Sequence, residues 1–231
     1  MIIDFLVLAC SFKNGGRCVA GIDLSEKYKV KPFVRLVSKD VDSDYAIPVE
    51  DCLIDGKNEI QPLDIIKVDL LAKMPSNGAQ TENYIADLPL VKQFVGREKV
   101  EKLAEFVRPA PNGLSYPFDT KDPFLSVAKY KSYTHYSLQL VRAYNVNFYK
   151  KSNSMGDSKT KISFDIYVGN TKVALSDYSV TDPNYYITSE GINNAKVTHL
   201  SKAYLLISLG SSNDSSVYYK FVSGIIDSTN K

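Results

Sequence analysis

The sequence contains few of the residues that serve catalysis and metal binding. Its 231 residues include no tryptophan, two histidines and three cysteines, and Cys10, Cys18 and Cys52 form no CxxC pair. An odd number of widely spaced thiols argues against a disulfide framework or a zinc site and favours a reducing compartment. Walker, GxGxxG, GxSxG and HExxH motifs are also absent. We therefore expect a cytoplasmic protein that is no enzyme and holds no cofactor or metal.

Long apolar runs are absent as well. No segment approaches the roughly 20 apolar residues that are needed to cross a bilayer. Residues 1–12, MIIDFLVLACSF, are apolar enough to be mistaken for a signal peptide, but they have no basic start and include Asp4. We expect a buried first strand here and no membrane partner.

Charge is balanced over the whole chain but uneven between its halves. The net charge is +2, and hydrophobic residues make up 44% of the chain. Residues 1–115 hold 15 Lys/Arg and 17 Asp/Glu, whereas residues 116–231 hold 13 and 9, together with 13 of the 16 tyrosines. The second half is therefore the better candidate for a surface that binds a polyanion.

Short apolar stretches separated by turns predict a mostly β first half. Residues 2–10 form a continuous apolar run that is typical of a strand covered on both faces. The residues Asn14-Gly15-Gly16 predict a tight turn, and residues 18–24 then alternate between apolar and polar. Further strands are expected at 32–38 and 63–71, as in a small antiparallel barrel or sandwich.

One short helix is expected near residues 97–107. Val100, Leu103 and Phe106 recur there at helical spacing, and Pro109 would end the helix. The Pro- and Gly-rich segment that follows, residues 108–123, is typical of a linker. It predicts two domains, at 1–115 and 116–231.

The second half begins with the clearest strand pattern in the chain. Residues 136–148 follow a period of two in which the even-numbered residues, apart from Arg142, are apolar or aromatic, and this predicts one long, bent strand whose even-numbered residues face a core. A hairpin is expected over 162–176, and two more strands are expected at 203–210 and 217–226. The second domain is therefore also expected to be mostly β.

Several segments over nearly the whole chain carry a family resemblance. In the first half they are Cys10-Ser11, Gly16 to Gly21, Val34 to Ser38, Pro62 to Ile65 and Gln80 to Asn83. In the second half they are Ser137 to Arg142, Val180 to Pro183, Ile207 to Gly210 and Tyr219 to Val222. In this order they resemble the prokaryotic dual OB-containing domain family. The resemblance implies a mostly β fold of two tandem OB-like small β-barrels with one or two short helices.

The segment over residues 129–151 combines five basic residues and five tyrosines with no acid. Aromatic rings stack on unpaired bases while lysines neutralise phosphates, which is how OB faces bind single strands. The alternative is that tyrosine is simply favoured in strands. The residues expected at a nucleic-acid-binding surface are Lys129, Tyr130, Lys131, Tyr133, Tyr149, Lys150 and Lys151.

Arg142 lies on the expected apolar face, where an unpaired charge would be costly, so we expect it to meet a carboxylate, for which Asp182 is the candidate, or a carbonyl that closes the barrel. Gln80, Glu82 and Asn83 could read base edges, or they could hold a loop by bonding to its backbone. The favoured interpretation is structural: with Asp64 and Arg35 this cluster could form a network across the first barrel. The polar residues for which structural and binding roles both stay open are Arg35, Asp64, Gln80, Glu82, Asn83, Arg142, Asp182 and Lys220.

These patterns favour a non-catalytic module that binds single-stranded or locally unpaired nucleic acid. The alternative is a protein-interaction module that docks a separately encoded partner or enzyme. A family name that describes a fold does not decide between them.

Overall fold

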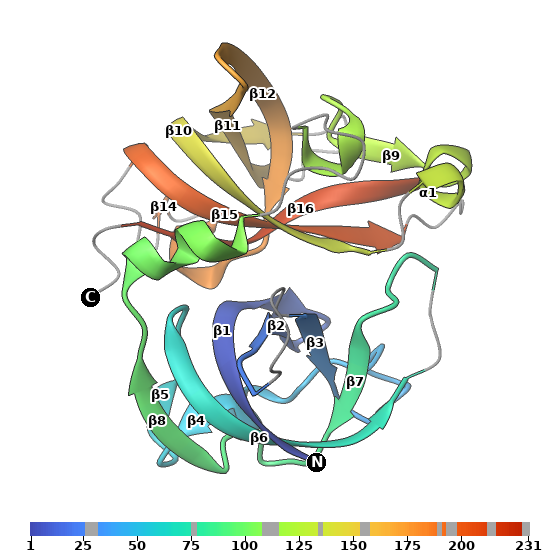
Figure 1. Ribbon diagram of the computed structural model, residues 1–231, viewed down its shortest axis with the longest axis vertical. Helices are drawn as coiled ribbons and strands as arrows, with labels where there is room; N and C mark the ends of the chain where they lie inside the picture. Colours follow the sequence, from blue (N-terminus) through green and yellow to red (C-terminus); the bar gives the residue numbers. More distant parts are fainter. Residues whose placement is uncertain are drawn as a thin grey trace.

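The computed structural model of the chain is mostly β and contains two strand-built bodies that pack against each other (Figure 1). It describes residues 1–25, 32–74, 78–107, 116–133, 136–152, 158–188, 191–192, 198–211 and 216–227. No helix among these residues is long and apolar enough to span a membrane.

Five strands of the first half close into a ring in the order β1-β2-β3-β7-β6-β1, with β3 and β7 parallel and the other neighbours antiparallel. They are β1 (Ile2–Lys13), β2 (Gly16–Asp23), β3 (Phe33–Val37), β6 (Asp64–Lys73) and β7 (Asn83–Ala86). Between and after them lie η1 (Val49–Cys52), β4 (Leu53–Ile54), β5 (Asn58–Glu59) and β8 (Gln93–Arg97). The predicted turn is present, because Asn14 and Gly15 both adopt positive φ between β1 and β2.

The second half repeats the same ring in the order β10-β11-β12-β16-β15-β10, with β12 and β16 parallel. Its strands are β10 (Leu138–Ser152), β11 (Ser158–Val168), β12 (Thr171–Val180), β15 (His199–Ser211) and β16 (Val217–Ile226). Around them lie η3 (Pro117–Asp119), β9 (Phe124–Ser126), α1 (Val127–Tyr133), η4 (Pro183–Tyr185), β13 (Ile187–Thr188) and β14 (Gly191–Ile192). The expected fold, two tandem OB-like barrels with short helices, is therefore confirmed.

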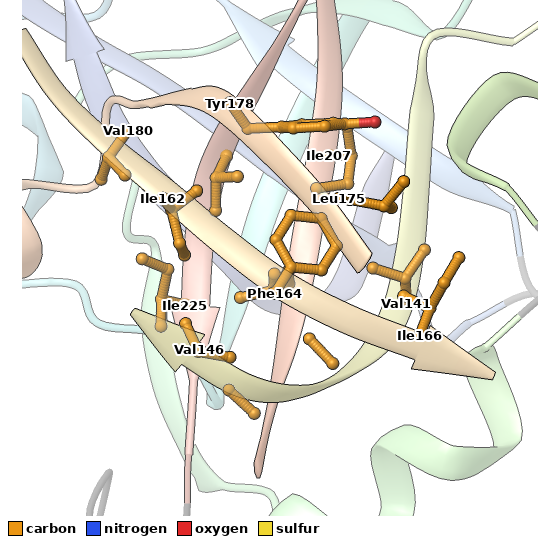
Figure 2. Close-up of a cluster of buried hydrophobic side chains, with 14 of the residues drawn as sticks. Val141, Val146, Ile162, Phe164, Ile166, Leu175, Tyr178, Val180, Ile207 and Ile225 are labelled. Carbon is orange, nitrogen blue, oxygen red and sulfur yellow. The ribbon is translucent and has the colours of Figure 1, made fainter. Parts of the chain in front are cut away.

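The core of the second barrel is filled by side chains from all five strands of its ring. Figure 2 shows Phe164 of β11 among aliphatic side chains such as Val146 of β10, Leu175 of β12 and Ile225 of β16. These side chains are almost fully buried, and each fully buried residue of this size contributes about 1.5–3 kcal/mol. The barrel thus has its own hydrophobic core.

A β-bulge interrupts the alternation that the sequence predicts for β10. Asn145 has φ 48°, and the pairing with β11 skips between Tyr144 and Asn147. A bulge adds one residue to one strand, so side chains on its two sides exchange faces. A single buried face over the whole strand is therefore excluded.

The exchange of faces changes which residues reach the second core. After the bulge the even-numbered Val146 faces that core, as predicted, but before the bulge Val141 and Ala143 do so. Leu138 and Leu140 instead pack between the two barrels. The prediction was wrong for the first part of β10 because both faces of the strand are covered there.

The two barrels share a third apolar cluster. The first barrel contributes Leu6 and Leu8 of β1 and Ile22 of β2, and the second contributes Leu140 of β10 and Leu206 of β15. All five side chains are buried. An apolar interface of this kind fixes the barrels relative to each other rather than leaving them on a flexible linker.

The helix expected near residues 97–107 is present as η2 (Val100–Phe106), which is a 3₁₀ helix. Val100, Leu103 and Phe106 are three residues apart, and a 3₁₀ helix has three residues per turn, so these side chains share one face. Leu103 is buried in the cluster between the barrels, and the other two pack partly against it. The predicted domain boundary borders residues 108–115, which lie outside the described residues.

Candidate nucleic-acid interface

OB barrels bind oligonucleotides on the outer face of their second and third strands. In the first barrel these strands are β2 and β3, and Ala20 and Ile22 of β2 are buried in the cluster between the barrels, with Phe33 of β3 packed against it. In the second barrel the equivalent strands are β11 and β12, whose outward residues are largely exposed or half-buried. Only the second barrel therefore leaves this face largely open among the described residues.

We call the outward side of β11, β12 and the adjoining part of β10 the open face. Aromatic and basic side chains are neighbours across its strands, since Tyr149 pairs with Lys161 and Tyr167 pairs with Lys172. Its tyrosines and lysines are Tyr144, Tyr149, Tyr167, Lys151, Lys159, Lys161 and Lys172. Rings beside cations are the arrangement that single-strand binding requires.

The tyrosines of the open face differ in how accessible their rings are. Tyr167 is 51% exposed, and Tyr144 packs against it edge-on with the ring centroids 5.2 Å apart. Tyr149 is half-buried, donates a hydrogen bond to Asp177 Oδ1 at 2.9 Å and accepts one from the Asp177 amide at 3.0 Å. Burial raises the pKa of Tyr149. Tyr167 is therefore the ring best placed to stack on a base.

Two aspartates organise the cations of the open face. Asp177 binds Lys151 at 2.8 Å, and Asp165 binds Lys172 at 2.9 Å and Asn145 at 2.6 Å. Hydrogen bonds from Lys151 and Tyr149 lower the pKa of Asp177, and those from Asn145 and Lys172 lower the pKa of Asp165. Four lysines face these two carboxylates, so the open face keeps a positive balance.

Lys161 lies at the centre of the open face. Its ammonium donates to Ser179 Oγ at 2.8 Å and to the carbonyl oxygen of Asp177 at 3.1 Å. Burial lowers its pKa. These two bonds hold the ammonium in a defined position beside Tyr149.

The predicted surface over residues 129–151 is only partly on the open face. Tyr149 and Lys151 lie there, and the exposed Lys150 is beside them on β10. Lys129 and Lys131 belong to α1, which lies beside β9 (Figure 1), and Lys129 donates to the carbonyl oxygen of Asp119 at 2.8 Å. The side chain of Tyr133 lies outside the described residues.

Tyr130 was expected on the surface, and this was wrong. It is buried, and its ring packs edge-on against Tyr218 with the centroids 5.1 Å apart. Its hydroxyl donates to the carbonyl oxygen of Ala79 at 2.9 Å, and burial raises its pKa to about 12. Because Ala79 belongs to the loop before β7, this tyrosine joins the second barrel to the first and offers no stacking surface.

Arg35 and Glu82 connect the first barrel to the start of β10. Arg35 is 2% exposed, and its Nη2 donates to Ser137 Oγ at 2.9 Å and lies 3.5 Å from Glu82 Oε1. The Ser137 hydroxyl also donates to Glu82. Gln80 donates to the carbonyl oxygen of Leu209 at 3.4 Å and accepts from Asn83 at 3.2 Å. The cluster crosses between the barrels, whereas the prediction placed it within the first.

Asp64 takes no part in that cluster, so the predicted membership was wrong there. It pairs with Arg97 at 3.0 Å and accepts from the amide of Gln61 at 2.7 Å. Burial raises its pKa. Its role lies at the pairing of β6 with β8.

The predicted pair of Arg142 and Asp182 does not form. Arg142 is half-buried, donates to the hydroxyl of Tyr204 at 3.0 Å and lies over its ring, 5.4 Å from the centroid. Asp182 is buried and accepts from the amides of Asn184 at 3.0 Å and Ile225 at 2.8 Å. Burial raises the pKa of Asp182 to about 7. The two side chains have separate partners, because the bulge turns Arg142 away from the second core.

Lys220 is 1% exposed within the second barrel. Its ammonium donates to the carbonyl oxygen of Thr120 at 2.7 Å and lies 5.6 Å from the ring centroid of Tyr178. Burial lowers its pKa to about 7. A lysine in this position has no contact with the open face.

Sequence reasoning missed five members of the open face, namely Tyr144, which was predicted to face a core, and Tyr167, Lys159, Lys161 and Lys172. The signal was present for those on β11, because the even-numbered residues of this strand are apolar, which sends its odd-numbered residues outward. Applying the same parity to Tyr167 would have placed it on the surface.

One protein family, described as the dual OB-containing domain, has a model that matches residues 3–225 of the chain. This span includes every strand of both rings except the first residue of β1 and the last residue of β16. No curated protein and no solved structure matches the chain.

Proposed function

Because the chain belongs to the dual OB-containing domain family, we propose that it binds single-stranded nucleic acid on the open face of its second barrel and catalyses no reaction. The family describes an OB-type binding module, and OB folds commonly bind oligonucleotides on this face. The observation that carries the proposal is the exposed Tyr167 ring beside Lys172, on a face whose other end carries Lys151, Lys159 and Lys161.

The mechanism combines stacking with charge neutralisation. An unpaired base stacks on Tyr167, and the edge-on contact with Tyr144 restricts the orientation of the Tyr167 ring. Lys172, which pairs with Tyr167, contacts the adjacent phosphate, and Lys161 and Lys159, six and eight residues back along β11, contact phosphates further along the strand. A duplex keeps its bases stacked on one another, so the ring favours single strands.

Fluorescence anisotropy with labelled single-stranded DNA, single-stranded RNA and duplex tests the proposal at low and near-physiological salt. Affinity for single strands should exceed affinity for duplex and fall steeply as salt rises. Tyr167→Ala should weaken single-strand binding about tenfold, from the ~1–3 kcal/mol that one stacked base contributes.

A matched control is Tyr219→Ala. Tyr219 is 46% exposed, close to the exposure of Tyr167, but it belongs to β16 and pairs with β9. It should leave the affinity unchanged. Equal losses from both variants, or no binding at low salt, would contradict the proposal.

The alternative, docking of a protein partner, is favoured by one feature of the first barrel. Phe94 and Val95 of β8 are 41% and 49% exposed, and among the described residues β8 pairs with β6 alone. An edge strand with exposed apolar side chains can accept a strand from a partner. Substituting both residues by serine should then abolish co-purification of that partner while nucleic-acid affinity stays the same.

A further inference from the structure

A cavity at one end of the first barrel takes no part in the proposed function. At this end, which we call the barrel mouth, β1, β3 and β7 begin and β2 and β6 end. The cavity has a volume of about 310 Å³ and is lined by residues of β2, β3, β6 and β7. Sites for small ligands typically have volumes of ~300–1,000 Å³, so the barrel mouth suits a compact molecule.

Apolar and aromatic side chains form the walls of this cavity. Val34 of β3 and Leu70 of β6 are buried in the hydrophobic core of the first barrel, and the half-buried Tyr84 of β7 packs against the same core. Lys73 pairs with Tyr84 across β6 and β7, and its ammonium lies 5.9 Å from the centroid of the Tyr84 ring. These four side chains therefore share the inner face of the ring of strands.

Asp23, the last residue of β2, brings a carboxylate to the same inner face. It pairs directly with Phe5 of β1, which is buried in the core of the first barrel, and directly opposite residues share a face of the sheet. Asp23 is 4% exposed, and its Oδ1 accepts a hydrogen bond from the amide of Ser25 at 2.8 Å. That donor is neutral, and no lysine or arginine in the described part of the chain forms an ion pair with Asp23. A buried charge without an opposite charge is costly, so this carboxylate favours a ligand that brings a positive charge.

Three other charged groups line the cavity among the residues that the structure describes. The carboxylate of Glu82 already accepts a hydrogen bond from Ser137 of the second barrel, and the N-terminal ammonium of Met1 is bound by Asp69 at 2.6 Å. The third group is the ammonium of Lys73, which repels any second positive charge that a ligand carries into the cavity. The barrel mouth therefore suits a ligand with one positive charge rather than two.

We propose that the barrel mouth binds a small monoamine, with its primary ammonium group at Asp23 and its apolar body against the walls of the cavity. The ammonium donates a charge-assisted hydrogen bond to the carboxylate, which is stronger than a bond between neutral groups. An aromatic body gains a further contact with the ring of Tyr84. The site shares no residue with the open face and does not depend on the proposed function.

Isothermal titration calorimetry of the full chain with phenethylamine and phenylethanol tests the proposal. The two molecules have the same apolar body, and the second has a hydroxyl group in place of the ammonium. The amine should bind, and the alcohol should bind at least about tenfold more weakly, because it brings no charge to Asp23. This comparison uses the wild-type protein, so it does not depend on the folding of any variant.

Asp23→Asn keeps an acceptor for the amide of Ser25 and removes the negative charge. It should weaken phenethylamine at least about tenfold and leave the alcohol nearly unaffected. The matched control is Asp55→Asn, which makes the same change of charge at an exposed residue outside the cavity and should leave amine binding unchanged. Thermal unfolding checks that both variants are folded.

Hexylamine and hexamethylenediamine test the preference for a single charge. The diamine should bind severalfold more weakly than the monoamine, because its second ammonium meets that of Lys73. Lys73→Met should remove this difference. A diamine that binds wild type as tightly as the monoamine would contradict the assignment.

Crossed measurements separate this site from the open face. Asp23→Asn should leave the affinity for single-stranded nucleic acid unchanged, and Tyr167→Ala should leave the affinity for phenethylamine unchanged. The proposal is overturned if no amine binds at millimolar concentration, if phenylethanol binds as tightly as phenethylamine, or if Asp55→Asn weakens amine binding as much as Asp23→Asn.

Discussion

Replacing the buried Lys220 with methionine should change how the stability of the protein depends on pH. The ammonium of Lys220 lies beside Tyr178, with Asp119, Asp122 and Lys129 close enough to influence its charge. Burial dominates these influences and lowers its pKa to about 7. In the unfolded chain the same group has a pKa of about 10.4.

The sign and size of the effect follow from these two pKa values. Between about pH 7 and pH 10 the unfolded chain binds the proton and the folded protein does not, so the free energy of unfolding rises with pH in this range. The slope approaches 1.4 kcal/mol per pH unit, which gives about 2 kcal/mol between pH 7 and pH 9. Below pH 7 Lys220 is charged in both states, so the free-energy cost of burying its ammonium is nearly constant.

Urea unfolding followed by circular dichroism at pH 7, 8 and 9, under reducing conditions, measures this slope. The wild-type free energy should rise relative to that of Lys220→Met by about 2 kcal/mol over the range. Taking the difference between the two proteins removes the contributions of other titrating groups, including the buried Cys10, whose pKa is raised by Cys52 and by burial. Parallel pH profiles for the two proteins would refute the reasoning.

Two further substitutions test the contact between the barrels. Gly224→Ala places a Cβ 2.1 Å from a carbonyl oxygen of β1, so urea unfolding should show a loss of about 1–3 kcal/mol, and an unchanged midpoint would show that the strands separate easily. Ser137→Ala deprives both Arg35 and Glu82 of a buried partner and should cost about 1–3 kcal/mol. The control Ser176→Ala changes an exposed residue and should stay within about 0.5 kcal/mol of wild type, so a similar loss from both serine variants would speak against the cluster.

The parts of the fold that depend on local pattern could be predicted from the sequence. Asn14 and Gly15 predict the first hairpin, because the turn requires positive φ and these two residue types adopt it readily. The three-residue spacing of Val100, Leu103 and Phe106 likewise predicts a helix. Because the spacing of these three residues fits both a 3₁₀ helix and an α-helix, it does not distinguish between them.

The parts that depend on a single inserted residue or on distant partners could not be predicted. The bulge at Asn145 leaves little trace in the sequence, yet it decides which face Arg142 occupies. Tyr130 reads as a surface residue next to lysines, and only the packing of a loop from the other barrel buries it. Periodicity describes one strand at a time and carries no information about what covers each face.

The two rings have the same strand order, but their equivalent faces have different surroundings and therefore carry different residues. The outer side of β2 packs against the second barrel, so it needs apolar residues such as Ala20 and Ile22. The outer side of β11 is open, so Lys161 and Tyr167 are tolerated there and lysine keeps the surface soluble. The open face holds three of the 13 tyrosines and four of the 13 lysines and arginines in residues 116–231, whereas others, such as Tyr178 and Lys220, are buried in the second barrel. A net charge of +2 for the whole chain hides this difference.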